Sequence, residues 1–227
     1  IEEKLGQVIP LDTVFNDESG NQISLRQLIN KPIILAPVYF GCPDVCSFLL
    51  YNVAGALNQL SSEPGKEYQV LAVSFDETEK PPLALEKKRL YLKMIEKPFP
   101  EEAWRFLTGE EENIRKLTEA IGFHFKREGK TFQHPILMVI LSPGGKITRY
   151  MYGTDVLPFD LKMALLEASE GRTGPTVSRV LRFCFSYDPK GRKYVFNTLK
   201  VTGIVTLAFA LSFILFLVVK GKRIQPK

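Results

Sequence analysis

The chain has 227 residues, a length that fits one domain with an appendage, and 45% of its residues are hydrophobic. Its net charge of +5 is unevenly distributed, because residues 1–169 carry 19 basic and 23 acidic side chains, whereas residues 170–227 carry 11 and 2. The main part of the chain is therefore mildly acidic, which gives no support to nucleic-acid binding.

Hydrophobic patterning predicts strands that alternate with helices from residue 8 to residue 168. In chain order, the first half is expected to contain a hairpin at 8–15 and 22–25, a helical turn at 25–29, strands at 33–40 and 68–75, and helices at 43–60 and 82–95. The second half is expected to contain strands at 104–107, 136–141 and 146–152, and helices at 110–121 and 159–168. This alternation predicts an α/β sandwich around a mixed central sheet.

Two of the three cysteines lie where the buried strand at 33–40 passes into the next helix. If that helix begins at Pro43, the spacing of Cys42 and Cys46 puts their Cβ atoms roughly 5–6 Å apart on one face. A disulfide requires about 3.5–4.5 Å, so bridging would need local adjustment and would give a reducible bond. Two thiolates at that separation can share one soft metal ion directly. The helix N-terminus favours thiolates, which both redox exchange and metal binding require.

His134 is the candidate third ligand, because the only other histidine, His124, is expected to face outward from a strand. His134 precedes Pro135, which opens a strand. In thioredoxin-like folds, whose order of elements the sequence shares to this point, a cis-proline at this place lies against the cysteine pair. We therefore expect a cis His134–Pro135 bond and an imidazole facing both sulfurs. Two thiolates and an imidazole suit copper, since thiolates favour Cu(I) and imidazole tolerates Cu(II).

These features resemble the Sco (SenC) family of copper-delivery proteins for haem-copper oxidase assembly. The resemblance covers about residues 5–170 and is carried by Tyr39–Cys46, Val73–Asp76 with Pro81 after it, Trp104–Gly109, and His134 ahead of a strand. By this resemblance Cys42, Cys46 and His134 are copper ligands, and Asp44 and Asp76 support them nearby.

The chain departs from the family pattern at two places. Family members commonly have an N-terminal anchor, whereas the visible anchor here is C-terminal. A Thr-His pair is frequent before the first cysteine, and here only Gly41 stands there. The predicted ligand set survives both departures.

The resemblance implies a metallochaperone, not an enzyme in the strict sense, that passes copper or electrons to the binuclear copper site of oxidase subunit II. One alternative is a thiol–disulfide reductase of that site, which would use Cys42 and Cys46 but not His134. Another is a permanent accessory subunit of a respiratory-chain complex. A thiol peroxidase is disfavoured, because no motif supplies an activating arginine.

An uncharged run at 201–219 predicts one transmembrane helix over residues 198–219, since about 20 apolar residues span a bilayer. It follows a basic, aromatic connector at 170–197 that suits a membrane interface, in which Cys184 is expected to be a plain residue. The chain begins at Ile1, which suggests a removed leader, and a cysteine pair suits an oxidising compartment. We therefore expect the copper domain, residues 1–169, on the periplasmic side of the inner membrane and the tail, residues 220–227, in the cytoplasm.

Overall fold

The computed structural model describes residues 1–129, 131–173, 185–188 and 193–196, with single positions at 202 and 206. The chain divides into two units, Ile1–Gly174 and Pro175–Lys227. In the second unit, β10 (Phe185–Asp188) and β11 (Lys193–Phe196) form an antiparallel pair. No helix within the described part of the chain is long and apolar enough to span a bilayer. Cys184 and nearly all of the predicted span at 198–219 lie outside the described residues.

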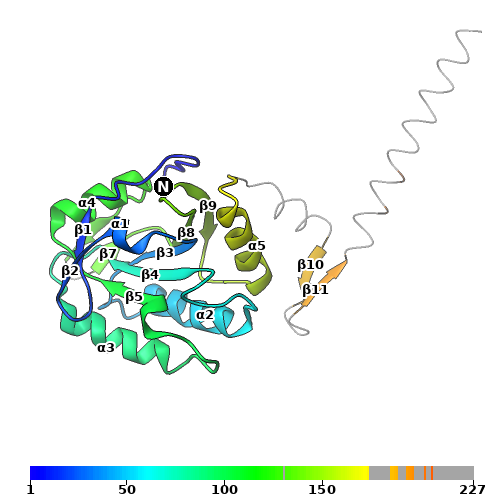
Figure 1. The fold of residues 1–227 in the computed structure, drawn as a ribbon, viewed down its shortest axis with the longest axis horizontal. Coiled ribbons are helices and arrows are strands. Elements are labelled where there is room, and N and C mark those ends of the chain that lie inside the picture. The colour runs from blue at the N-terminus through cyan, green and yellow to red at the C-terminus, as the bar shows by residue number, and fades with distance from the viewer. Residues whose placement is uncertain (130, 174–184, 189–192, 197–201, 203–205, 207–227) are drawn as a thin grey trace, which may run out of the picture. The chain divides into compact units, whose positions relative to one another are not determined.

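The first unit is built on a five-stranded sheet with the strand order β5-β4-β3-β8-β9 (Figure 1). The strands are β3 (Ile33–Val38), β4 (Gln69–Ser74), β5 (Trp104–Leu107), β8 (Leu137–Leu141) and β9 (Ile147–Tyr152). β3, β4 and β5 are parallel, whereas β8 is antiparallel to both β3 and β9. β3 and β4 are buried at every position, as expected for strands with helices on both faces. The predicted thioredoxin-like α/β fold with a mixed sheet is confirmed.

Helices cover both faces of this sheet (Figure 1). α2 (Val45–Gln59) contacts both α3 (Pro81–Leu92) and α5 (Pro158–Ser169) on one face. On the other face, Ile114 and Leu117 of α4 (Glu111–Ala120) line a small apolar cavity with residues of β3 and β4. Two single turns complete the set, α1 (Leu25–Leu28) and the 3-10 turn Glu101–Ala103. The predicted helices are therefore present, but α2 begins at Val45, two residues later than predicted.

The first 24 residues cover both edges of the sheet. At the β9 edge, the Gly6 N–H donates to the Ile147 carbonyl and the Ile147 N–H donates to the Gln7 carbonyl, both at 2.8 Å. At the β5 edge lies the predicted hairpin, with β1 (Val14–Asn16) antiparallel to β2 (Gln22–Ser24). Asn16 and Thr108 exchange two backbone hydrogen bonds of 2.7 and 3.0 Å there. The N-terminal segment thus pairs its backbone with Ile147 of β9 at one edge and with Thr108, the residue after β5, at the other.

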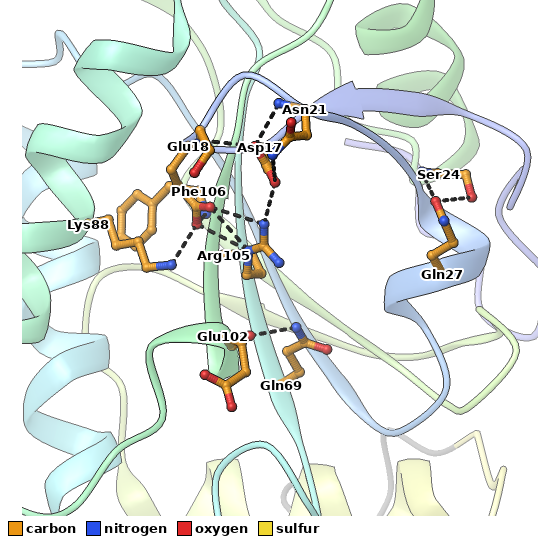
Figure 2. A network of polar contacts seen from close by, with 11 residues as sticks. Asp17, Glu18, Asn21, Ser24, Gln27, Gln69, Lys88, Glu102, Arg105 and Phe106 are labelled. Carbon is orange, nitrogen blue, oxygen red and sulfur yellow. Dashed lines mark hydrogen bonds and ion pairs between the residues drawn. The ribbon is translucent and has the colours of Figure 1, made fainter.

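The turn of this hairpin buries two acidic side chains against β5 (Figure 2). The Glu18 carboxylate accepts the Phe106 N–H at 2.7 Å and lies 3.2 Å from the Lys88 ammonium. The Arg105 guanidinium bridges both acids, donating to Glu18 at 3.2 Å and to Asp17 at 3.0 Å. The network therefore supplies an acceptor to an edge N–H and pairs two buried acids with two cations.

A second hairpin, which the sequence pattern does not predict, lies between α4 and β8. It consists of β6 (Lys126–Glu128) and β7 (Thr131–Gln133), and it forms a separate two-stranded sheet. His124 precedes it, exposed and outside any strand, so its predicted strand is wrong although its outward position is right. His134 directly follows β7, so this hairpin leads into the candidate site.

Candidate metal centre

The two cysteines and His134 meet at the end of the sheet where β3 ends and β8 begins. The chain turns after β3, with the Cys42 N–H donating to the Tyr39 carbonyl at 3.2 Å. The Ser47 hydroxyl donates to the Cys42 carbonyl at 2.9 Å and ties this turn to the start of α2. Cys42 therefore lies in the turn and Cys46 in the first turn of the helix, as the sequence predicts.

Cys42 and Cys46 are both free thiols and nearly inaccessible, with 4% and 3% of their surfaces exposed. Hydrogen bonding from the Cys46 thiol, together with the Tyr39 hydroxyl and the backbone N–H groups of Cys46 and Asp44, outweighs burial and lowers the pKa of Cys42 to about 5. The same hydrogen bond, together with burial, raises the pKa of Cys46 well above its ordinary value. The opposite pKa shifts mean that the metal-free pair shares one proton, which favours a thiolate at Cys42 and a thiol at Cys46.

The imidazole of His134 lies against Cys46, with Nε2 3.7 Å from the Cys46 sulfur. Its other nitrogen, Nδ1, lies 2.8 Å from the Pro135 carbonyl oxygen. A carbonyl can only accept, so Nδ1 carries a proton, and in the neutral ring Nε2 then presents its lone pair toward the sulfur. This is the arrangement of a metal-ligating histidine whose second nitrogen is held by the protein.

Aromatic rings enclose the imidazole. The rings of Tyr39, Phe75 and Phe123 lie with their centroids 5.9, 5.1 and 6.2 Å from that of His134. Phe132, the last buried residue before the histidine, packs on both Tyr39 and Phe75. This packing restricts the orientation of the imidazole and limits water around it.

The peptide bond between His134 and Pro135 is trans, since the structure contains no cis peptide bond among the residues that it describes. The predicted cis bond is therefore wrong. His134 still reaches Cys46, because the preceding hairpin and the hydrogen bond to the Pro135 carbonyl orient its ring.

Glu79 is a site residue that the sequence analysis does not identify. Its buried carboxylate accepts the N–H groups of Phe40 and Gly41 at 2.7 and 2.6 Å and the Ser74 hydroxyl at 2.6 Å. A Cβ atom at Gly41 would lie only 3.2 Å from the carboxylate, so glycine at this position lets the two segments approach. Burial raises the pKa of Glu79 above its ordinary value despite these donors. Glu79 thus braces the turn that carries Cys42.

The two acids predicted to support the ligands have different surroundings. Asp44 occupies the N-cap position of α2 and donates its backbone N–H to the Cys42 sulfur, but its side chain makes no capping hydrogen bond. The Asp76 carboxylate is bound by the Thr78 N–H and hydroxyl and by the Arg127 guanidinium. Asp76 therefore acts on the hairpin that precedes His134.

The donor set can accommodate one soft metal ion. With metal–sulfur and metal–nitrogen bonds of about 2.3 and 2.0–2.1 Å, tetrahedral ligation separates the two donors by about 3.5 Å. The observed 3.7 Å between Cys46 and His134 is close to this value. The described residues contain no group of three His, Cys, Asp or Glu side chains already gathered around one point. The arrangement therefore consists of two contacts, Cys42 to Cys46 and Cys46 to His134, and needs a small closure to bind an ion with all three.

A thioredoxin-like fold with a buried cysteine pair and an adjacent imidazole defines a class of thiol and metal-binding proteins. The chain belongs to the SCO1/SenC family, whose sequence profile matches residues 9–160. A comparison with curated protein sequences found no match.

Solved structures agree with this assignment. A candidate electron transfer protein of Aquifex aeolicus VF5 is 29% identical, with a TM-score of 0.67 over 76% of this chain and 98% of that chain. Arabidopsis thaliana ScoI, solved with copper bound, is 19% identical, with a TM-score of 0.57 over 72% and 99%. BsSco, described as a cytochrome c oxidase assembly protein with a disulfide switch, is 21% identical, with a TM-score of 0.53 over 74% and 99%. The last two likenesses bear on the fold.

Proposed function

We propose that this chain binds one copper ion through Cys42, Cys46 and His134 and takes part in the assembly of a haem-copper oxidase. Copper is then the cargo, passed to the binuclear copper site of subunit II, and the protein is a metallochaperone. Membership of the SCO1/SenC family supports this role, as do the copper bound to Arabidopsis ScoI and the oxidase-assembly description of BsSco.

One observation carries the proposal. The Cys46 sulfur lies 3.7 Å from Nε2 of His134, and hydrogen bonding from the same thiol lowers the pKa of Cys42, so one proton is shared within this group of donors. A soft cation that replaces this single proton would have two thiolates and an imidazole within reach, a set that suits both Cu(I) and Cu(II). Binding then releases one proton from Cys46.

Copper stoichiometry tests the ligand set. The full chain, reduced, loaded with Cu(II) and desalted, should retain one copper per chain. His134→Ala should lose Cu(II) binding, whereas His124→Ala, which removes the exposed histidine, should bind as wild type does. Absence of copper in the wild type, or unchanged Cu(II) binding in His134→Ala, would refute the assignment.

A second candidate function is thiol–disulfide exchange, favoured by the low pKa of Cys42 beside the protonated Cys46 thiol. The thiolate can attack a partner disulfide, and Cys46 then closes an intramolecular disulfide, so that two electrons pass to the partner. Mild oxidation of the full chain in detergent should remove two thiols and leave Cys184 reactive. Loss of Cys184 together with only one other thiol would contradict the pairing. Reductase activity should persist in His134→Ala, which separates this function from copper binding.

We propose further that the helix expected at residues 198–219 anchors the chain in the inner membrane, with the copper domain outside the cytoplasm. The uncharged run and the cysteine pair support this placement. Protease added to intact spheroplasts should digest the domain and spare a C-terminal epitope tag. A protected domain with a cleaved tag would reverse the topology.

A further inference from the structure

We propose that Arg127 is a positioning residue for the metal centre, because it holds the β6–β7 hairpin where His134 meets Cys46. The inference rests on the proposed function in one respect only, that His134 is a copper ligand. It assigns a role to Arg127 and to Asp76, which it binds, and neither residue is one of the three proposed ligands.

The β6–β7 hairpin has few attachments of its own. It is a two-stranded sheet separate from the central sheet. All three residues of β6 are exposed, as are Thr131 and Gln133 of β7, and only Phe132 is buried. Because an isolated two-stranded hairpin is at best marginally stable, contacts with the rest of the domain must fix its position.

Arg127 supplies such a contact, with the loop that follows β4. Its Nη2 donates to Asp76 Oδ1 at 2.7 Å and to Glu77 Oε1 at 2.8 Å. Asp76 follows directly after Phe75 at the end of β4, and Thr78 holds its carboxylate with two hydrogen bonds of 2.9 and 2.7 Å. The ion pair therefore joins the hairpin to the loop between β4 and α3.

The same guanidinium also fixes the residue that leads to the histidine. The Arg127 guanidinium carbon lies 4.3 Å from the centroid of the Phe132 ring, opposite it in the hairpin register. Phe132 packs on Tyr39 and Phe75 at 5.0 and 5.3 Å, and both of these rings also contact His134. Moving the hairpin would thus move Phe132 and, two residues later, the imidazole.

The opposite side of the metal centre is fixed in a different way. Cys46 belongs to a 15-residue helix, and Glu79 braces the turn before it through two backbone N–H groups. The small closure needed to gather all three ligands therefore falls on the side of His134. Arg127 limits how far that side can move away from Cys46.

The test compares Arg127→Gln with Lys126→Gln in the full chain. The control removes a charge from the neighbouring position of the same strand, where the lysine pairs, among the described residues, only with exposed Glu128 at 3.7 Å. Loss of a direct outer partner of a metal ligand typically costs about 10–100-fold in metal affinity, and Arg127 acts on His134 only through Phe132, so Arg127→Gln should weaken Cu(II) binding by about 10-fold, the lower end of that range. Lys126→Gln should stay within about twofold of wild type, as expected for an exposed ion pair.

Two readouts distinguish positioning from a merely structural role. The first is measured with Cu(I), which two thiolates can hold without the imidazole: Arg127→Gln should weaken Cu(I) binding when His134 is present and cause no further loss in the His134→Ala background, whereas a general destabilisation would weaken Cu(I) binding in both. Arg127→Lys, which keeps the charge, should recover part of the Cu(II) affinity. Equal losses from Arg127→Gln in both backgrounds, or unchanged Cu(II) binding in that variant, would overturn the inference.

A copper-free measurement keeps the inference separate from the proposed function. In ¹⁵N-histidine spectra of the reduced full chain, the wild type should show His134 protonated at Nδ1. Arg127→Gln should shift the His134 signals and leave those of His124 unchanged, and Arg127→Asp combined with Asp76→Arg should restore them in part. Unshifted signals would overturn the positioning role even if copper binds. Shifted signals in a chain that binds no copper would refute the proposed function alone.

Discussion

Two buried glutamates, Glu18 and Glu79, each hold backbone N–H groups at the end or edge of a strand, but their surroundings differ. Glu18 accepts the N–H of an edge strand and is paired with Lys88 and Arg105 (Figure 2). Glu79 accepts two N–H groups of the cysteine turn and the Ser74 hydroxyl, and it has no ion pair among the residues that the structure describes. They are 5% and 7% exposed, so the contrast lies in charge compensation and not in depth.

This contrast distinguishes the β5 edge, where the acid has a purely structural role, from the candidate metal centre. At the β5 edge each buried charge is neutralised within the fold, which is the usual condition for keeping charges out of water. Beside the cysteines, the Glu79 carboxyl group and the Cys42 thiolate lie in one region, and no described residue forms an ion pair with Glu79 there. A bound metal ion would bring positive charge to this region. We therefore expect the two glutamates to respond differently to mutation and to pH.

The largest effect is expected from Glu18→Ala. Removing the acid leaves the buried Lys88 without its ion pair, Arg105 with Asp17 alone and the Phe106 N–H without its acceptor, and breaking such a buried pair costs about 3–5 kcal/mol. Urea denaturation of the full chain measures this loss. Glu112→Ala, which removes an exposed acid paired with Lys116, should change the stability little, because solvent screens an exposed ion pair. If the two variants lost similar amounts of unfolding free energy, the buried network of Glu18 would contribute no more than an exposed ion pair, and the contrast would be wrong.

A smaller effect is expected from Glu79→Gln. The amide has a single acceptor oxygen, so one donor among Phe40, Gly41 and Ser74 would face an NH₂ group, at a cost of about 1–3 kcal/mol. Because the pKa of Glu79 is raised in the native state, wild-type stability from this group is greatest at low pH and declines as the pH rises through the raised value. The difference between wild type and variant should therefore shrink from pH 4 toward about pH 7, the range above an ordinary carboxyl pKa. A difference that grows with pH would contradict the sign of this shift.

The smallest effect is expected from Asp17→Asn, and its pH dependence should have the opposite sign. Burial alone would raise the pKa of Asp17, but hydrogen bonds from Asn21 and Ser19 and the Arg105 charge lower it below its ordinary value. Its contribution to stability is present above the ordinary pKa and is lost as the pH falls through the lowered one. Denaturation midpoints from pH 6 down to about pH 3 should therefore fall less steeply in the variant. If the midpoints of wild type and variant fell in parallel as the pH is lowered, Asp17 would not contribute to the loss of stability in acid.

Predominantly apolar runs make the central strands predictable. Residues 33–40 and 68–75 are buried on both faces, and no other placement of such runs avoids water. The position of Cys42 and Cys46 follows from the end of the first run, and the contact of Cys46 with His134 was anticipated from the order of elements. The assignment of these residues as copper ligands stays a prediction.

The other parts of the site depend on contacts that no local pattern encodes. The β6 segment is Lys-Arg-Glu, without hydrophobic alternation, and the hairpin is fixed by Arg127 and Phe132 through distant partners. Glu79 lies in a polar loop and finds its acceptor role 38 and 39 residues away in sequence. The cis bond was expected by analogy of fold, whereas the isomer of an X–Pro bond is set by its own tertiary surroundings.

The coverage of both sheet edges by the first 24 residues has a consequence for the aggregation of the chain during synthesis. An unpaired edge strand is a template for another molecule's strand, and it promotes aggregation unless it is blocked. Here one continuous segment blocks both edges. Since this segment is synthesised before β5 and β9, its partners emerge late, and the edges are protected only when the last strand has formed. The interval before that pairing is when a nascent chain of this fold is most exposed to self-association.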